Sequence, residues 1–101
     1  MNQTDNPHKN FKIAVSVICG DDVKEKIPSV ARMANSFTGY TDKIYIGFNG
    51  TNYSVDNFKA DLLPLLDDRE KIFIERISPW EDNFAKSRNE AYALIPLDEY
   101  E

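Results

Sequence analysis

Three short apolar segments, each followed by a stretch of helical periodicity, constrain this chain more than any other feature. They are Phe11–Ile18, Lys43–Phe48 and Lys71–Ile77. The first is a nearly continuous apolar run, typical of a strand that is buried on both faces of a parallel sheet. Strands that alternate with helices favour a parallel sheet with right-handed crossovers. The sequence therefore predicts an α/β fold, a three-layer Rossmann-like parallel sheet in β-α-β-α-β-α order.

The predicted helices have recognisable ends. Pro28 suits the first turn of the first helix, and Gly39 suits its end. Ser54 is the expected N-cap of the second helix, which Pro64 weakens or ends. The third helix is expected to begin near Asp82. The residues expected to face inward are Ile27, Val30, Ala31, Ala34, Phe37, Phe58, Leu62, Leu63, Phe84, Ala85, Ala91, Leu94 and Ile95.

Composition excludes several classes of function. With 101 residues and a net charge of −5, the chain has room for one domain and no basic face for nucleic acid. Its apolar runs are strand-sized, well short of the roughly 20 residues of a membrane span. Residues 1–10 lack the apolar core of a signal peptide and are expected to form a flexible polar arm. A lone cysteine, Cys19, fits a reducing compartment, so we expect a cytoplasmic protein.

Ligands of parallel α/β sheets bind at the carboxyl ends of the strands. Three predicted loops lie there: Cys19–Asp22, Asn49–Ser54 and Ser78–Asn83. We therefore expect the functional residues of this chain to lie in these loops and in the helix turns that follow them.

The third of these loops begins the most informative segment, Ser78–Ala91, which reads SPWEDNFAKSRNEA. It resembles the PW-x-DDFA-x-ARN-x-A segment of many inverting family 2 glycosyltransferases, which have the GT-A fold. Ile13–Pro28 and Ile44–Asn52 resemble that family's first strand with its loop and its second strand with its turn. The resemblance covers about Lys12 to Leu94.

The resemblance implies that residues 11–101 are the N-terminal, nucleotide-sugar-binding part of a GT-A domain that transfers a hexose from a nucleotide-diphosphate sugar. Arg88 would neutralise the donor diphosphate, as guanidinium groups pair well with phosphate oxygens. The nucleotide-binding residues that it implies are Cys19, Gly20, Asp21, Asn49, Gly50, Thr51 and Arg88. Trp80 and Asn89 are possible donor-site residues.

The chain also departs from the family pattern. Phe48 stands where family members commonly have an Asp that binds uracil or ribose, so the identity of the base stays open. The Asp-x-Asp metal motif and the catalytic base are missing. We therefore expect no catalytic residue and no metal ligand in this chain, and Mg²⁺ or Mn²⁺ only in the intact enzyme. The domain is expected to be truncated before the Asp-x-Asp strand and inactive alone, with the rest of the domain or a partner chain covering the sheet edge.

Alternatives remain at several positions. An acidic pair after the first strand, such as Asp21 and Asp22, is also a feature of response-regulator receivers. A receiver needs an Asp at the end of its third strand, where this chain has Glu75 and Arg76. A non-catalytic nucleotide-binding or protein-interaction module of Rossmann-like fold is the main alternative function. Trp80 could stack on a ligand or seal its loop against the core. Arg88 could also be a solvated surface charge, although the family resemblance favours a functional role.

Overall fold

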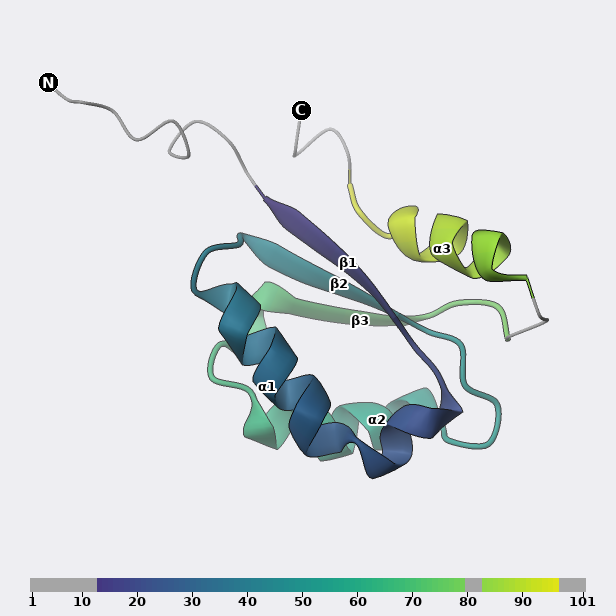
Figure 1. Ribbon diagram of the computed structural model, residues 1–101, viewed down its shortest axis with the longest axis horizontal. Coiled ribbons are helices and arrows are strands. Elements are labelled where there is room, and N and C mark those ends of the chain that lie inside the picture. Colours follow the sequence, from purple (N-terminus) through teal and green to yellow (C-terminus); the bar gives the residue numbers. More distant parts are fainter. Residues whose placement is uncertain (1–12, 80–82, 97–101) are drawn as a thin grey trace, which may run out of the picture.

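The computed structural model describes residues 13–79 and 83–96, which form a mixed α/β structure around a three-stranded parallel sheet (Figure 1). The strands are β1 (Ala14–Cys19), β2 (Lys43–Phe48) and β3 (Ile72–Arg76). The α-helices are α1 (Ile27–Thr38), α2 (Val55–Leu62) and α3 (Phe84–Tyr92). Short 3₁₀ helices are η2 (Asp21–Glu25), η3 (Leu63–Leu65) and η4 (Arg69–Lys71). The predicted parallel α/β sheet is confirmed.

The strands lie in the order β1-β2-β3, so β2 is central. Ala14 of β1 lies opposite Lys43, and Ile44 of β2 lies opposite Ile72. Five of the six residues of β2 are buried, whereas in β1 only Cys19 is. The apolar residues of β1 are half-exposed because, among the described residues, no strand lies on its outer side.

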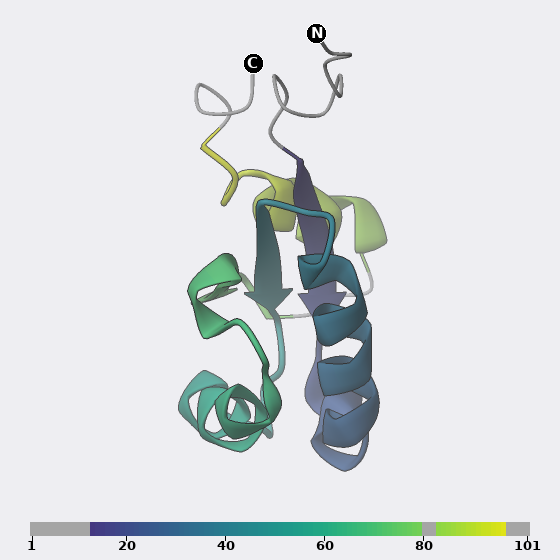
Figure 2. The same ribbon diagram turned by 90° about the vertical axis from the view of Figure 1, so that its left-hand side faces the viewer.

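The helices cover opposite faces of the sheet. α1 and α2 lie on one face and α3 lies on the other (Figures 1 and 2). Because successive side chains of a strand point to opposite faces, Ile44, Ile46 and Phe48 of β2 enter the core beneath α1 and α2. Gly47 points the other way and faces Ala91 of α3.

An aromatic cluster fills the core beneath the carboxyl end of β2. The rings of Phe48 and Phe58 are stacked with centroids 4.9 Å apart, and Tyr53 meets both rings edge-on. Both phenylalanines are fully buried. Phe48 thus belongs to the core, and its side chain is not available to a ligand at the position where the glycosyltransferase pattern has an Asp.

The predicted ends of the helices agree well with the structure. Ser54 caps α2, its hydroxyl accepting the amide N–H of Asn57 at 3.0 Å. α1 ends before Gly39, and Pro64 lies in the 3₁₀ turn that follows α2. α3 begins at Phe84, with the Asn83 side chain accepting the amide N–H of Lys86 at 3.1 Å.

The prediction that Phe84 and Ala85 face the core is wrong. Phe84 is 59% exposed, Ala85 is exposed, and the buried residues of α3 are Ser87 and Ala91. The reason is how closely α3 packs on β2. Since Gly47 has no side chain, α3 approaches the sheet closely through its small residues, which turns Phe84 outward toward β1.

None of the helices in the described ranges combines the length and the apolar composition that crossing a bilayer demands.

Replacing Gly47 by alanine tests this close approach. The added β-carbon would lie 2.9 Å from Cβ and 3.2 Å from Cα of Ala91, so the helix backbone itself has to move. We expect Gly47→Ala to lower the free energy of unfolding, measured by urea titration, by about 1–3 kcal/mol. Gly39→Ala is the control, because nothing lies within 4 Å of its added carbon and its backbone is right-handed helical. Equal stability of the two variants would contradict the close packing of α3.

Candidate functional site

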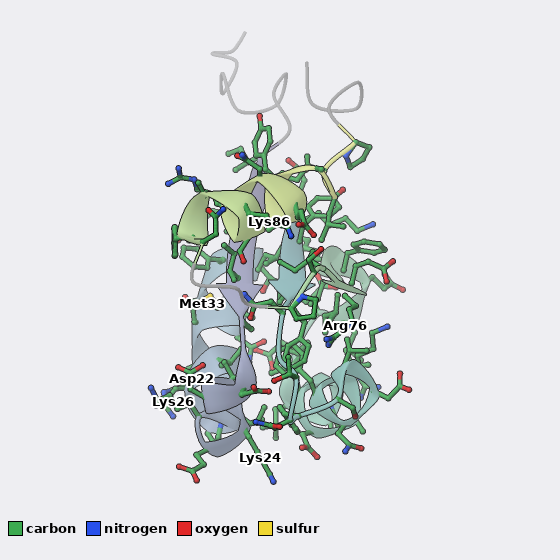
Figure 3. The ribbon with its side chains drawn as sticks, turned by 90° about the vertical axis from the view of Figure 1, so that its right-hand side faces the viewer. Asp22, Lys24, Lys26, Met33, Arg76 and Lys86 are labelled. Carbon is green, nitrogen blue, oxygen red and sulfur yellow. The ribbon has the colours of Figure 1, made fainter. Side chains whose placement is uncertain are left out.

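The carboxyl ends of β1 and β2, together with the start of α3, surround a hollow of about 530 Å³. Figure 3 looks onto this edge of the sheet, with Asp22 on the η2 side and Arg76, at the end of β3, on the other. We call this space the Asn49 hollow. Its lining residues are Ile18, Gly20, Asp21, Asp22, Asn49, Thr51 and Phe84.

The carboxylate of Asp21 holds the turn that follows β2. Its Oδ1 accepts the amide N–H groups of Asn52 at 2.9 Å and Tyr53 at 3.0 Å, and its Oδ2 accepts the hydroxyl of Thr51 at 3.1 Å. These bonds, led by that from Tyr53, hold the pKa of Asp21 below its usual value. Asp21 thus fixes one wall of the hollow in its ionised form.

Gly50 makes this contact possible. A β-carbon at this position would lie 2.6 Å from Oδ1 of Asp21 and 2.6 Å from the ring of Phe48. Gly50 is itself buried and does not line the hollow. Its place is therefore beneath the turn, where the absence of a side chain lets Asp21 reach the backbone of the next residues.

Asn49, which directly follows β2, is hydrogen-bonded to the end of β1 and to α3. Its amide N–H donates to the carbonyl of Cys19 at 2.9 Å, which extends the β1–β2 pairing by one step. Its side-chain Nδ2 donates to Oγ of Ser87 on α3 at 3.3 Å. Both residues are buried, at 5% and 4% exposure, yet Asn49 lines the hollow. Sequence reasoning missed Ser87, although the small pair Ser87 and Ala91, one helical turn apart, was a usable signal.

A second hollow of about 460 Å³ adjoins the first, and we call it the Arg88 hollow. Its lining residues are Ser16, Ile18, Phe84, Arg88 and Tyr92, so it shares Ile18 and Phe84 with the Asn49 hollow. The guanidinium carbon of Arg88 lies 5.6 Å from the centre of the Phe84 ring. Within the described ranges, Arg88 makes no ion pair, so its charge is available to an anion.

The two hollows differ in charge. Among the described residues that line them, the Asn49 hollow has two carboxylates and no cation, and the Arg88 hollow has one cation and no carboxylate. A ligand that spans both would place hydrogen-bond donors near Asp21 and Asn49. It would place an anionic group near Arg88, with the apolar Ile18 and Phe84 between the two ends.

The remaining predicted residues lie apart from these hollows. Cys19 is buried in the core under α1, where burial, with a smaller effect of the Asp22 charge, raises the pKa of its thiol to about 12. Asn89 is exposed and lines neither hollow, and Trp80 lies outside the described residues. Asp22 does line the Asn49 hollow, and its carboxylate lies 3.8 Å from Nζ of Lys26.

The described residues do not fit a divalent metal site. No group of three or more His, Cys, Asp or Glu side chains gathers within residues 13–79 and 83–96. Both carboxylate oxygens of Asp21 already accept hydrogen bonds from the turn.

Comparison of the chain with protein-family models, curated proteins and solved structures finds no match.

The role of Asp21 predicts a pH dependence of stability. Because the pKa of Asp21 is lowered in the folded state, its carboxylate contributes fully to the free energy of unfolding above the unfolded-state pKa, about 3.9. That contribution is lost as pH falls through the lower folded-state pKa. We expect Asp21→Asn to be less stable than the wild type at neutral pH in urea titrations, with the difference shrinking below that pH. Asp22→Asn is the matched control, since its exposed pairing with Lys26 contributes little. A difference for Asp21→Asn that is the same at every pH would contradict the ionised clamp.

Proposed function

We propose that this chain binds a nucleotide-diphosphate sugar at the carboxyl edge of its sheet. In this proposal residues 11–101 are the N-terminal part of a GT-A glycosyltransferase domain with a three-layer Rossmann-like arrangement. The observation that carries it is the gathering of predicted residues from separate segments. Gly20, Asp21, Asn49 and Thr51 line one hollow, and Arg88 lines the hollow beside it.

The charges of the two hollows favour one orientation of the bound nucleotide. The ribose and base have O–H and N–H groups, which suit the acceptors of the Asn49 hollow. The diphosphate would be repelled by Asp21 and Asp22 and attracted by Arg88. The apolar surface of Ile18 and Phe84 lies between the two ends. We therefore place the base and ribose near Asn49 and the diphosphate near Arg88.

In hexosyl transfer, negative charge develops on the departing diphosphate, and a guanidinium near it stabilises the transition state. Arg88 would serve this purpose in an intact enzyme. The proposal assigns neither the catalytic base nor the divalent metal to the described residues. A cytoplasmic location is part of the same proposal, because sugar nucleotides would be available there and the lone Cys19 suits it.

A protein-interaction module is the second candidate. It is favoured by the exposure of Phe84, at 59%, and Tyr92, at 53%, beside β1, which has a neighbouring strand on one side only among the described residues. The unpaired backbone groups of an edge strand can pair with a strand of another chain, and side-chain contacts beside that edge give specificity. This candidate predicts that no nucleotide binds in the two hollows.

Isothermal titration calorimetry with UDP and GDP tests the proposed function. We expect the wild type to bind at least one of them and Arg88→Ala to bind it about 10-fold to 100-fold more weakly, because charge-assisted bonds to the diphosphate are lost. Arg32→Ala, on α1 across the sheet, is the matched control and should bind like the wild type. Absence of heat with either nucleotide in the wild type would favour the interaction module, and equal affinities of wild type and Arg88→Ala would remove Arg88 from the site.

A further inference from the structure

The outer edge of β3 is open in the described part of the chain. β3 lies at one side of the sheet, and β2 is the strand that it pairs with among residues 13–79 and 83–96. The amide N–H of Ile77 donates to the carbonyl of Phe48 at 3.0 Å, so the backbone of Ile77 faces β2. Successive residues of a strand turn their N–H and C=O groups to opposite sides. The backbone groups of Ile72 and Ile74 therefore point away from β2, where a further strand can pair with them.

An apolar hollow of about 260 Å³ lies along this edge. Its lining residues are Lys59, Leu63, Ile72, Phe73 and Ile74. Phe73 is 37% exposed although it is the middle residue of β3 and its ring meets that of Tyr45 edge-on. Natural proteins commonly protect an open edge with proline or with charges in the middle of the strand, and the three central residues of β3 include neither. A strand added here would cover apolar side chains as well as pair the backbone.

The charges that flank these three apolar residues indicate which strand fits. Residues 70–76 read EKIFIER, so an acid followed by a base stands on each side of the apolar centre. When a second copy of this segment runs antiparallel with the two Phe73 residues opposite each other, Lys71 lies opposite Glu75 of the second copy. A two-fold axis repeats this pair on the other side of Phe73. Opposite charges directly across an antiparallel pair stabilise it, so the segment is complementary to itself.

This register also agrees with the backbone. Phe73 turns its N–H and C=O toward β2 and forms the non-hydrogen-bonded pair on the axis, whereas Ile72 exchanges hydrogen bonds with Ile74 of the second copy. An axis at Ile72 would instead place Lys71 opposite Phe73. An axis at Ile74 would place Glu75 opposite Phe73. Charges meet charges and apolar residues meet apolar residues only when Phe73 lies on the axis.

The two charged residues are placed to form this pair. Neither Lys71 nor Glu75 makes an ion pair within the ranges that the structure describes. Glu75 is exposed and accepts the amide N–H of Arg76 at 3.4 Å. Nζ of Lys71 donates to the carbonyl of Thr38 at 2.8 Å, and an ammonium group has further N–H groups for a carboxylate. The other edge strand offers no such pattern, since β1 contains no charged residue.

We infer that β3 is the interface of a homodimer, in which two copies of this chain pair antiparallel and their sheets join into one. The apolar hollows of the two copies then meet and are closed from water. This inference does not depend on nucleotide binding, because the Asn49 and Arg88 hollows are lined by residues of other segments than β3. Failure of the dimer would leave the proposed function in place, and the reverse also holds.

Sedimentation velocity of the full chain over a range of concentrations tests the inference. We expect the wild type to dimerise, and a monomer at every concentration up to about 1 mM would overturn it. Glu75→Lys places a lysine opposite Lys71 on both sides of the axis and should weaken the dimer at least about tenfold. Glu25→Lys is the matched control, because it makes the same charge change in η2, after the distant strand β1. Equal dissociation constants of Glu75→Lys and Glu25→Lys would contradict the pairing.

Mixing two variants separates the charge pair from a loss of folding. Lys71→Glu places a glutamate opposite Glu75 of the second copy, so it should dimerise as poorly as Glu75→Lys. A mixture of the two variants has opposite charges at both pairs, and we expect a heterodimer within about threefold of the wild-type affinity. If both variants keep the wild-type circular dichroism and form no heterodimer, the proposed register is wrong.

A disulfide locates the axis without altering either charged residue. The Cα atoms of a non-hydrogen-bonded antiparallel pair lie about 4.5 Å apart, within the range of a disulfide. We therefore expect Phe73→Cys to form a covalent dimer under mild oxidation. Ser78→Cys is the control, since its two copies would lie far apart on either side of the axis, and the native Cys19 is buried. Covalent dimers of Ser78→Cys as abundant as those of Phe73→Cys, or none with either variant, would overturn the inference.

Discussion

The contact between Gly47 and Ala91 determines where the residues of the candidate site lie. A β-carbon on residue 47 would lie 2.9 Å from that of Ala91, so the contact exists only because Gly47 lacks one. One helical turn, four residues at about 1.5 Å each, nearly matches two strand residues at about 3.3 Å each. Ser87 of α3 therefore meets Asn49 of the segment after β2 when Ala91 meets Gly47. The same placement leaves Phe84 and Arg88 beside β1, where they line the second hollow.

Asp21 and Asn49 have different tasks although they lie in the same hollow. Asp21 spends both carboxylate oxygens on the turn after β2 and so gives that wall its shape. Asn49 donates its side-chain nitrogen to Ser87 of α3, and its oxygen lines the hollow in which we propose that a ligand binds. A residue whose polar atoms are all satisfied by the protein stabilises a site, whereas one with a buried spare atom is suited to recognition. In the proposed function, Asp21 would therefore support the site, and Asn49 and Arg88 would recognise the ligand.

Local signals were enough to predict much of the fold. The bounds of β2 and the Ser54 cap follow from an apolar run, an Asn-Gly turn and a capping residue, all of which act within a few residues. The inward face of α3 could not be predicted this way, because its composition is polar and the face is chosen by Gly47, which lies far away in sequence. The engagement of Asp21 depends likewise on the distant turn at residues 51–53. The glycosyltransferase resemblance suggested Arg88 and Asn49 but gave Ser87 no role.

The central claim is that a nucleotide binds between the carboxyl ends of β1 and β2, beneath the start of α3. Titration of ¹⁵N-labelled protein with UDP and GDP, followed by two-dimensional NMR, tests it residue by residue. We expect the largest chemical-shift changes at the amides of Gly20, Asn49 and Thr51 and at Nε of Arg88. Little change is expected at Thr41 and Lys71, near the amino ends of β2 and β3 at the opposite edge of the sheet. Shifts confined to that opposite edge, or none with either nucleotide, would contradict it.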